Sequence, residues 1–139
     1  PFLQYMQKNL SIAPLVVSHV SYETCVAVGN GLAEAIKNYG KPVLIVASTD
    51  MTHYESRQSA SSKDSMALER IKALDPEGLY STVVDNRISM CGIMPTTVAL
   101  VAALALGAKK AELIRYTDSG EASGDTSKVV GYAGLVITK

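Results

Sequence analysis

The sequence predicts an α/β protein with a mostly parallel sheet and helices on both faces, a three-layer α/β/α arrangement. Residues 12–20 and 43–47 are short apolar runs rich in β-branched side chains, which is typical of buried strands. Between them, residues 22–39 repeat apolar positions with the period of a helix. Because strand, helix and strand in this order form a crossover connection, we expect the two strands to be parallel.

The helix expected between these strands has signals at both ends. Ser21 is a suitable N-cap and Gly40 a suitable stop. Cys25 falls on the apolar face, so we expect it to be a small buried hydrophobic residue. Gly29 and Gly31 weaken the helix interior, so we expect them to allow close packing against the sheet.

The middle of the chain predicts three further helices. A serine-rich stretch, residues 55–63, is expected to be an exposed loop near the site, followed by a helix over residues 62–74. Pro76 suits the first position of a second helix, which ends near residue 86. Residues 96–106 form the most apolar segment, and we expect a central helix buried on more than one side.

The ends of the chain complete the expected single domain of residues 1–139. Residues 1–8 predict one or two turns of helix. Residues 109–117 and 129–138 predict two more strands, separated by a Gly/Ser/Asp-rich loop at residues 118–128. The sheet is therefore expected to have about four strands.

Composition excludes several classes of function. The 139 residues carry 13 basic and 13 acidic side chains, so no basic surface for nucleic acid or for a membrane is expected. The longest apolar stretch is too short to span a bilayer. Two cysteines are too few for a disulfide scaffold, which favours a reducing, cytoplasmic setting.

Two titratable residues follow the second predicted strand. Asp50 and His53 lie where the carboxyl end of a parallel strand would deliver them to a pocket. An imidazole exchanges protons near neutral pH and a carboxylate can orient it, so this pair is the candidate catalytic pair. The alternative is that Asp50 caps a turn and His53 is an ordinary loop histidine.

Cys91 is the candidate metal ligand, and it precedes Gly92 and a Pro95-led helix start. A thiol near a helix N-terminus tends towards thiolate, which is both a nucleophile and a metal ligand. Gly92 lets the backbone approach whatever Cys91 faces. The alternative is a buried, inert cysteine.

Two other side chains are candidates for the same pocket. His19 ends the first predicted strand and is either a further member of the site or a capping residue. Tyr54 follows His53 directly, although large aromatic side chains often serve only in packing. The chain has no Gly-x-Ser-x-Gly elbow, HExxH sequence, phosphate-binding loop or dinucleotide-binding fingerprint.

Three motifs resemble the MEMO family, in the order and approximate spacing of that family. They are Ser48-Thr-Asp50-Met-Thr-His53-Tyr54, Met90-Cys91-Gly92 with a following proline, and Gly131-Tyr132-Ala-Gly-Leu. The family is similar to class III extradiol dioxygenases, which are non-haem iron enzymes with an α/β fold. The resemblance implies a metal pocket in which Cys91 is a ligand, and Asp50 and His53 line the wall.

The resemblance also implies that this chain is the C-terminal half of a larger MEMO-like domain. Family members are about twice as long, and their other pocket histidines belong to an N-terminal half. Cys91 alone cannot hold iron, which needs about three protein ligands. Iron is the expected metal by resemblance, with zinc or copper also open.

Two functions therefore remain open at this point. One is a metal-dependent oxidoreductase site, and the other is a non-catalytic module that binds a peptide or small molecule, unless the fragment is inactive. A truncated sheet would leave an unpaired edge and exposed apolar surface. We therefore expect association with the missing N-terminal half or self-association.

Overall fold

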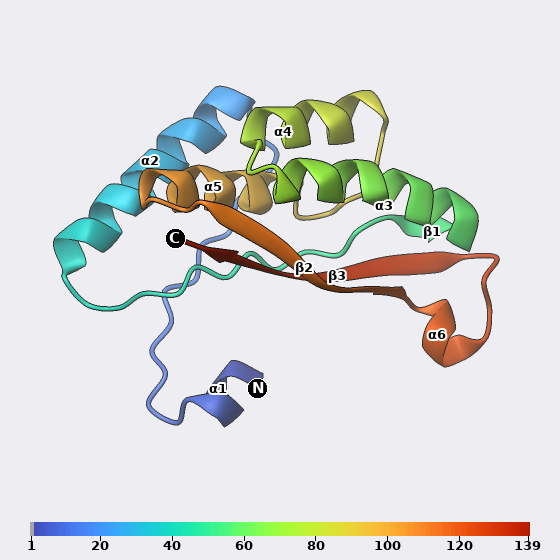
Figure 1. Ribbon diagram of the computed structural model, residues 1–139, viewed down its shortest axis with the longest axis horizontal. Helices are drawn as coiled ribbons and strands as arrows, with labels where there is room; N and C mark the ends of the chain where they lie inside the picture. Colours follow the sequence, from blue (N-terminus) through green and yellow to red (C-terminus); the bar gives the residue numbers. More distant parts are fainter. Residues whose placement is uncertain (1) are drawn as a thin grey trace.

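A computed structural model describes residues 2–139, so Pro1, the first residue of the predicted N-terminal helix, lies outside the described residues. The α/β class is confirmed (Figure 1). The elements in chain order are α1 (Phe2–Met6), α2 (Tyr22–Tyr39), β1 (His53–Glu55), α3 (Arg57–Lys72), α4 (Pro76–Asp85), α5 (Ile93–Ala105), β2 (Lys110–Asp118), α6 (Gly120–Ser123) and β3 (Val129–Thr138).

The sheet of the described residues is antiparallel, so the mostly parallel arrangement is not what these residues form. Its strand order is β1-β3-β2, and β2 and β3 pair as a long hairpin from Lys110 opposite Thr138 to Asp118 opposite Gly131. Both strands come from segments that the sequence predicts as strands. The helices α2 to α5 gather on one side of this sheet (Figure 1), whereas helices were expected on both faces.

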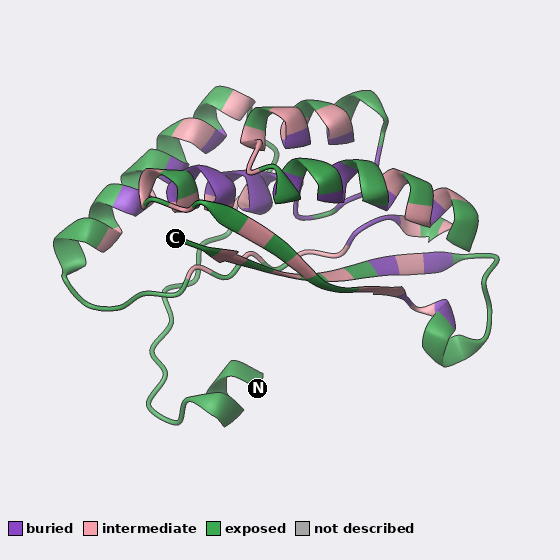
Figure 2. Cartoon of the chain, in the orientation of Figure 1, coloured by how far each residue is buried: buried purple, intermediate pink, exposed green. Residues whose placement is uncertain are grey.

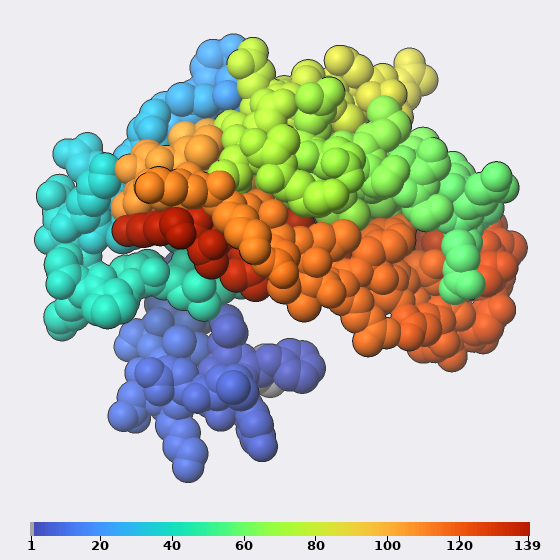
Figure 3. Space-filling view, in the orientation of Figure 1, coloured from blue at the N-terminus to red at the C-terminus, as the bar shows by residue number. Residues whose placement is uncertain are grey.

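Residues 12–20 and 43–47, the two strands of the predicted crossover, have no regular secondary structure and belong to no ladder among residues 2–139. Several of their apolar side chains are exposed, with Val16 at 98% and Leu44 at 75%, whereas Val17 and Val20 pack against the core. A β-branched run favours extended backbone, but a strand also needs a neighbouring edge for its N–H and C=O groups. The described residues provide no such edge for these segments. Figure 3 shows the N-terminal residues, in dark blue, protruding from the rest.

Helix α2 follows its sequence signals closely. The hydroxyl of Ser21 accepts the N–H of Thr24, and Gly40 ends the helix with a φ of +69°. A Cβ at Gly29 would lie 2.7 Å from the Cβ of Val101, so this glycine allows α2 to approach α5 rather than the sheet. The prediction for Gly31 was wrong, because nothing lies within 4 Å of where its Cβ would be.

The core lies between the helices and the sheet, as the buried residues in Figure 2 show. The central position of α5 is confirmed, since eight of its 13 residues are buried. Cys25 is fully buried in the same core, and this burial raises the pKa of its thiol. The predicted core position of Cys25 is thus confirmed.

Two predicted loops contain helix. Helix α3 begins at Arg57 rather than near residue 62, because Ser56 caps it by accepting the N–H of Ser59. The predicted loop at residues 118–128 holds the short helix α6, which ends at Gly124 with a φ of +78°. None of the helices between residues 2 and 139 is both long and apolar enough to cross a membrane.

Candidate metal centre

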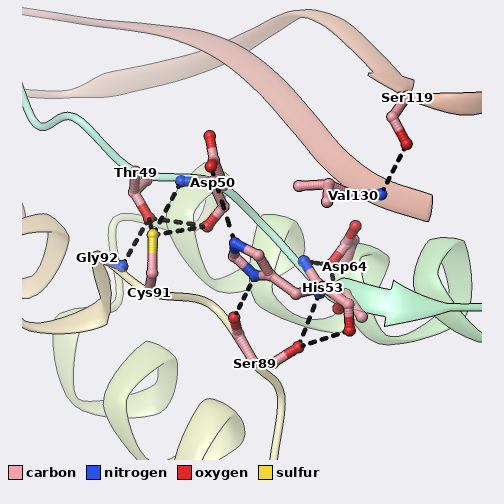
Figure 4. A network of polar contacts seen from close by, with 10 residues as sticks. Thr49, Asp50, His53, Asp64, Ser89, Cys91, Gly92, Ser119 and Val130 are labelled. Atoms are coloured by element: carbon pink, nitrogen blue, oxygen red, sulfur yellow. Dashed lines mark hydrogen bonds and ion pairs between the residues drawn. The ribbon is translucent and has the colours of Figure 1, made fainter. Parts of the chain in front are cut away.

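Three side chains with metal-binding atoms meet at one point of the molecule. The donor atoms of Asp50, His53 and Cys91 all lie within 4.8 Å of one another (Figure 4). Asp50 and His53 come from the segment that leads into β1, whereas Cys91 comes from the turn before α5. Residues 41 positions apart in the sequence therefore converge, although no parallel sheet delivers them.

The segment that carries Asp50 and His53 is attached to β3. The N–H of Met51 donates to the carbonyl of Gly131 at 2.9 Å, and the N–H of Gly131 donates to the carbonyl of Thr52 at the same distance. His53 then opens β1 opposite Val130. This pairing fixes the backbone on the β3 side and leaves the side chain of Asp50 on the surface.

Ser89 holds the imidazole of His53 in one orientation. The ring Nδ1 lies 2.7 Å from the carbonyl oxygen of Ser89, and the backbone N–H of His53 donates to the Ser89 hydroxyl at 2.8 Å. A carbonyl only accepts, so the network assigns the proton to Nδ1. In the neutral ring the lone pair is then on Nε2, which lies 3.8 Å from a carboxylate oxygen of Asp50.

Cys91 is held by backbone contacts from the same segment. Its sulfur accepts the N–H of Asp50 at 3.3 Å and lies 3.8 Å from the hydroxyl of Thr49. The N–H of Gly92 donates to that hydroxyl at 2.8 Å. A Cβ at Gly92 would lie 2.3 Å from the Cβ of Thr49, so only glycine permits this approach. The close approach of Thr49 thus explains why residue 92 is a glycine.

The cluster is open to solvent. The side chain of Asp50 is 48% exposed, that of His53 is 24% exposed, and Cys91 is exposed. Tyr54 has a φ of +58°, which is unusual for a residue with a side chain, and its ring centroid lies 6.0 Å from that of His53. Tyr54 therefore flanks the cluster as an exposed aromatic side chain.

His19 is not a member of this group of donors. The close-lying donors found among residues 2–139 are those of Asp50, His53 and Cys91, and His19 lies exposed in the extended N-terminal segment. The idea that His19 shares an edge with Asp50 and His53 required a parallel sheet. Without that sheet in the described residues, the structure does not bring His19 to the cluster.

Beneath the cluster lies a buried carboxylate that the sequence analysis missed. Asp64 of α3 is fully buried and accepts three hydrogen bonds. The N–H and the hydroxyl of Thr52 donate to one oxygen at 2.8 and 2.6 Å, and the hydroxyl of Tyr116 donates to the other at 2.7 Å. Burial and the hydrogen bond to Asp64 raise the pKa of Tyr116 well above its usual range.

A signal for Asp64 was present in the sequence. It precedes Ala67, Leu68 and Ile71 by three, four and seven residues, the spacing of one helix face, and all of these are buried. An acidic residue on the apolar face of a helix indicates a buried polar contact. Ser89 carried no comparable signal, because its role depends on a carbonyl and on the approach of a distant segment.

The fold and the cluster define an α/β protein with a surface group of one carboxylate, one imidazole and one thiol. The family model described as "Memo-like protein" matches residues 1–136. The chain therefore belongs to the MEMO family.

Curated relatives from methanogenic archaea agree with this assignment. The chain is 38% identical to a MEMO1 family protein of Methanothermobacter thermautotrophicus over 97% of its length, which is 49% of that relative. It is 39% identical to one of Methanopyrus kandleri over its whole length, covering 50% of the relative. A Methanosarcina mazei relative is 40% identical over 99% of the chain and 52% of its own length. The chain spans about half the length of the curated relatives it matches.

Proposed function

We propose that this chain supplies one wall of a metal-dependent redox site related to that of class III extradiol dioxygenases. In this site Cys91 holds the metal, while Asp50 and His53 stand beside it as ligands or proton-exchanging groups. The observation that carries the proposal is the convergence of a carboxylate, an imidazole and a thiol within 4.8 Å. Three such donors from two distant segments are the minimum that a protein needs to hold iron.

The donors present fit a transition metal. Metal bonds to sulfur, nitrogen and oxygen of this kind measure about 2.0–2.3 Å, so two donors on one ion lie at most about 4.4 Å apart. That limit applies to donors on opposite sides of an ion, whereas adjacent donors in tetrahedral coordination lie about 3.5 Å apart. The Asp50 oxygen and His53 Nε2, at 3.8 Å, are close to this spacing, and the group as a whole, within 4.8 Å, would have to contract around an ion. A thiolate ligand favours iron, zinc or copper over magnesium or calcium.

The chain's own residues would do three things at this site. The carbonyl of Ser89 keeps the proton of His53 on Nδ1, so Nε2 is free to bind a metal or to accept a proton. A carboxylate oxygen of Asp50 lies 3.8 Å from Nε2 of His53, close enough for both to face one ion. The sulfur of Cys91 accepts the N–H of Asp50, which holds it beside these two side chains. When bound, iron would supply the redox chemistry that these side chains lack.

Metal binding tests the proposal directly. The protein is purified without oxygen and its metal content is measured, and apo protein is then titrated with Co²⁺. Coordination by Cys91 predicts a thiolate-to-cobalt absorption band that disappears in Cys91→Ala. The matched control is Cys25→Ala, which removes the other thiol from a buried position far along the chain and should leave the band intact. The proposal is wrong if wild type and Cys91→Ala bind cobalt equally or not at all.

The alternative function is a non-catalytic module that binds a peptide or small molecule, and it can be tested in the same way. A ligand that shifts the NMR signals of Asp50 and His53, in protein that contains no metal and consumes no oxygen, would support that function. We also propose a cytoplasmic location, with which the two free cysteines agree.

The exposed segments suggest a larger sheet that needs a partner chain. We propose that residues 12–20 and 43–47 become strands of a mostly parallel three-layer sheet when the N-terminal half of the family domain, or a second copy, pairs with them. Exposed apolar side chains such as Val16 and Leu44, in backbone that no ladder pairs among residues 2–139, support this, as does the doubled length of the relatives. Light scattering on the chain alone should show self-association, and a monodisperse monomer would contradict the proposal.

A further inference from the structure

Asp64 is a buried carboxylate whose contacts need an explanation. It is fully buried, and no Lys or Arg nitrogen among residues 2–139 lies within 4.0 Å of it. A buried carboxylate without a cation lowers stability unless its oxygens are well hydrogen-bonded. Two of its three donors belong to Thr52, the residue directly before His53. The hydrogen bonds of Asp64 are thus concentrated on the segment that carries the cluster.

Residues of three elements hold that segment near Thr52. Asp64 reaches it from α3, Tyr116 of β2 orients the second oxygen of Asp64, and Gly131 of β3 pairs with its backbone. A Cβ at Gly131 would lie 2.1 Å from an Asp64 oxygen, so the absence of a side chain there lets the carboxylate reach Thr52. The backbone at Thr52 is therefore fixed on both sides.

The fixed backbone determines where the imidazole points. His53 follows Thr52, and its N–H and Nδ1 both meet Ser89, two residues before Cys91 (Figure 4). A rotation of the peptide at Thr52 would move the N–H of His53 off the Ser89 hydroxyl and turn Nε2 away from Asp50. The path from Asp64 to the imidazole is short, since it consists of the hydrogen bonds to Thr52 and one peptide unit.

We propose that Asp64 is a positioning residue for the metal centre, which aligns His53 with Cys91 by holding Thr52 from beneath. This inference rests on the proposed metal site for its functional meaning. Asp64 touches neither the donors nor any substrate, and it acts through the backbone of its neighbour. Supporting contacts of this kind typically change metal affinity by about 10- to 100-fold when they are removed.

Two isosteric variants test the proposal. Asp64→Asn replaces one acceptor oxygen by an amide donor, and Thr52→Val removes the hydroxyl donor while keeping the shape. The control Val83→Ala lowers stability from a buried position in α4 that has no part in the network. In Co²⁺ titrations we expect affinity to fall about tenfold or more in Asp64→Asn. We expect a smaller loss in Thr52→Val and a change below about twofold in Val83→Ala.

A second readout does not depend on metal. The chain has two histidines, so nitrogen-15 NMR resolves the ring of His53, with His19→Gln providing the assignment. Wild-type protein should show His53 with its proton on Nδ1, and Asp64→Asn should show a mixture of tautomers. If Asp64→Asn does not fold, the His53 tautomer is compared between Thr52→Val and wild type.

The outcomes separate this inference from the proposed function. Unchanged cobalt affinity and an unchanged His53 tautomer in both variants would overturn the positioning role, even if wild type binds metal. If wild type binds no cobalt, the proposed function fails. The NMR measurement then tests the inference without metal. A mixture of His53 tautomers in Asp64→Asn supports the positioning role, and a proton that stays on Nδ1 overturns it.

Discussion

Asp64 and Asp50 are two carboxylates at the same short segment, and their surroundings differ in burial and in hydrogen bonding. Asp64 is fully buried with three donors around it, whereas the side chain of Asp50 is 48% exposed and faces one imidazole at 3.8 Å. The first has the environment of a structural anchor, whereas the second is open to solvent beside the imidazole of His53. Two residues of backbone thus separate the anchored Thr52 from the exposed carboxylate of Asp50.

The two cysteines repeat this contrast. Cys25 is fully buried in the core and burial raises its pKa, so it is inert. Cys91 is exposed and accepts a backbone N–H from Asp50. Substitutions in the buried network should lower stability strongly, while substitutions in the open cluster should remove metal binding with little effect on stability.

Asp64→Ala should have the largest effect on stability. It leaves the N–H and hydroxyl of Thr52 and the hydroxyl of Tyr116 without their acceptor in a buried site. Each unsatisfied buried group costs about 1–3 kcal/mol, so we expect a loss of at least about 3 kcal/mol in the free energy of unfolding. Denaturant titration monitored by circular dichroism measures it. The control Asp85→Ala, an exposed carboxylate of α4, should change stability by less than about 0.5 kcal/mol. Equal stability of the two variants would contradict the anchor role.

Gly131→Ala should have the next largest effect. The new Cβ would lie 2.1 Å from an oxygen of Asp64 and 3.1 Å from the Cβ of Met51, so the buried carboxylate must move. Overpacking of this kind costs about 1–3 kcal/mol. Gly134→Ala is the matched control, because it lies in the same strand with nothing within 4 Å of its new Cβ. Thermal melts of the pair measure the difference, and equal melting temperatures would show that the network tolerates displacement.

Much of the fold follows from local sequence signals. Ser21 and Gly40 bound α2, Asp75 caps the helix that Pro76 opens, and the long β2–β3 hairpin matches two predicted strands. The direction of the sheet did not follow, because pairing is a property of neighbours and not of a segment. A β-branched run such as residues 43–47 predicts extended backbone, but only another strand makes it part of a sheet.

The candidate site could be predicted only in part. The residue types and spacing of Asp50, His53 and Cys91 indicated chemistry, and their proximity is a finding of the structure. Their metal and catalytic roles remain predictions. The role of Ser89 could not be predicted because a carbonyl acceptor has no side-chain signature. Asp64 lies inside the predicted helix of residues 62–74, but acidic side chains are usually exposed, and only the phase of the helix places it on the buried face.

A third prediction concerns pH and has a smaller expected effect. The guanidinium of Arg57 donates two hydrogen bonds to Asp118, and these lower the pKa of that carboxyl. A carboxyl with a lowered folded-state pKa contributes stability above its unfolded pKa of about 4, and loses it as pH falls through the folded value. Arg57→Met should therefore lower the melting temperature at pH 7 and approach wild type near pH 3.

The matched control for this pH prediction is Arg115→Met. The partner of Arg115 is Glu121, and both side chains are more than half exposed, so the pair is screened by solvent. Its melting temperature should differ little from wild type at either pH. A difference between wild type and Arg57→Met that is the same at pH 3 and pH 7 would assign the effect of Arg57 to packing.

The smallest stability effect is expected in the open cluster. Asp50→Asn retains the shape of an exposed side chain, and Cys91→Ser retains an acceptor for the N–H of Asp50. Both variants should unfold within about 0.5 kcal/mol of wild type, because exposed substitutions of similar size rarely cost more. Cys91→Ser should nevertheless lose the thiolate-to-cobalt band, and Asp50→Asn should weaken cobalt binding. A loss above about 1.5 kcal/mol would place these side chains among the packing residues and remove the distinction between anchor and cluster.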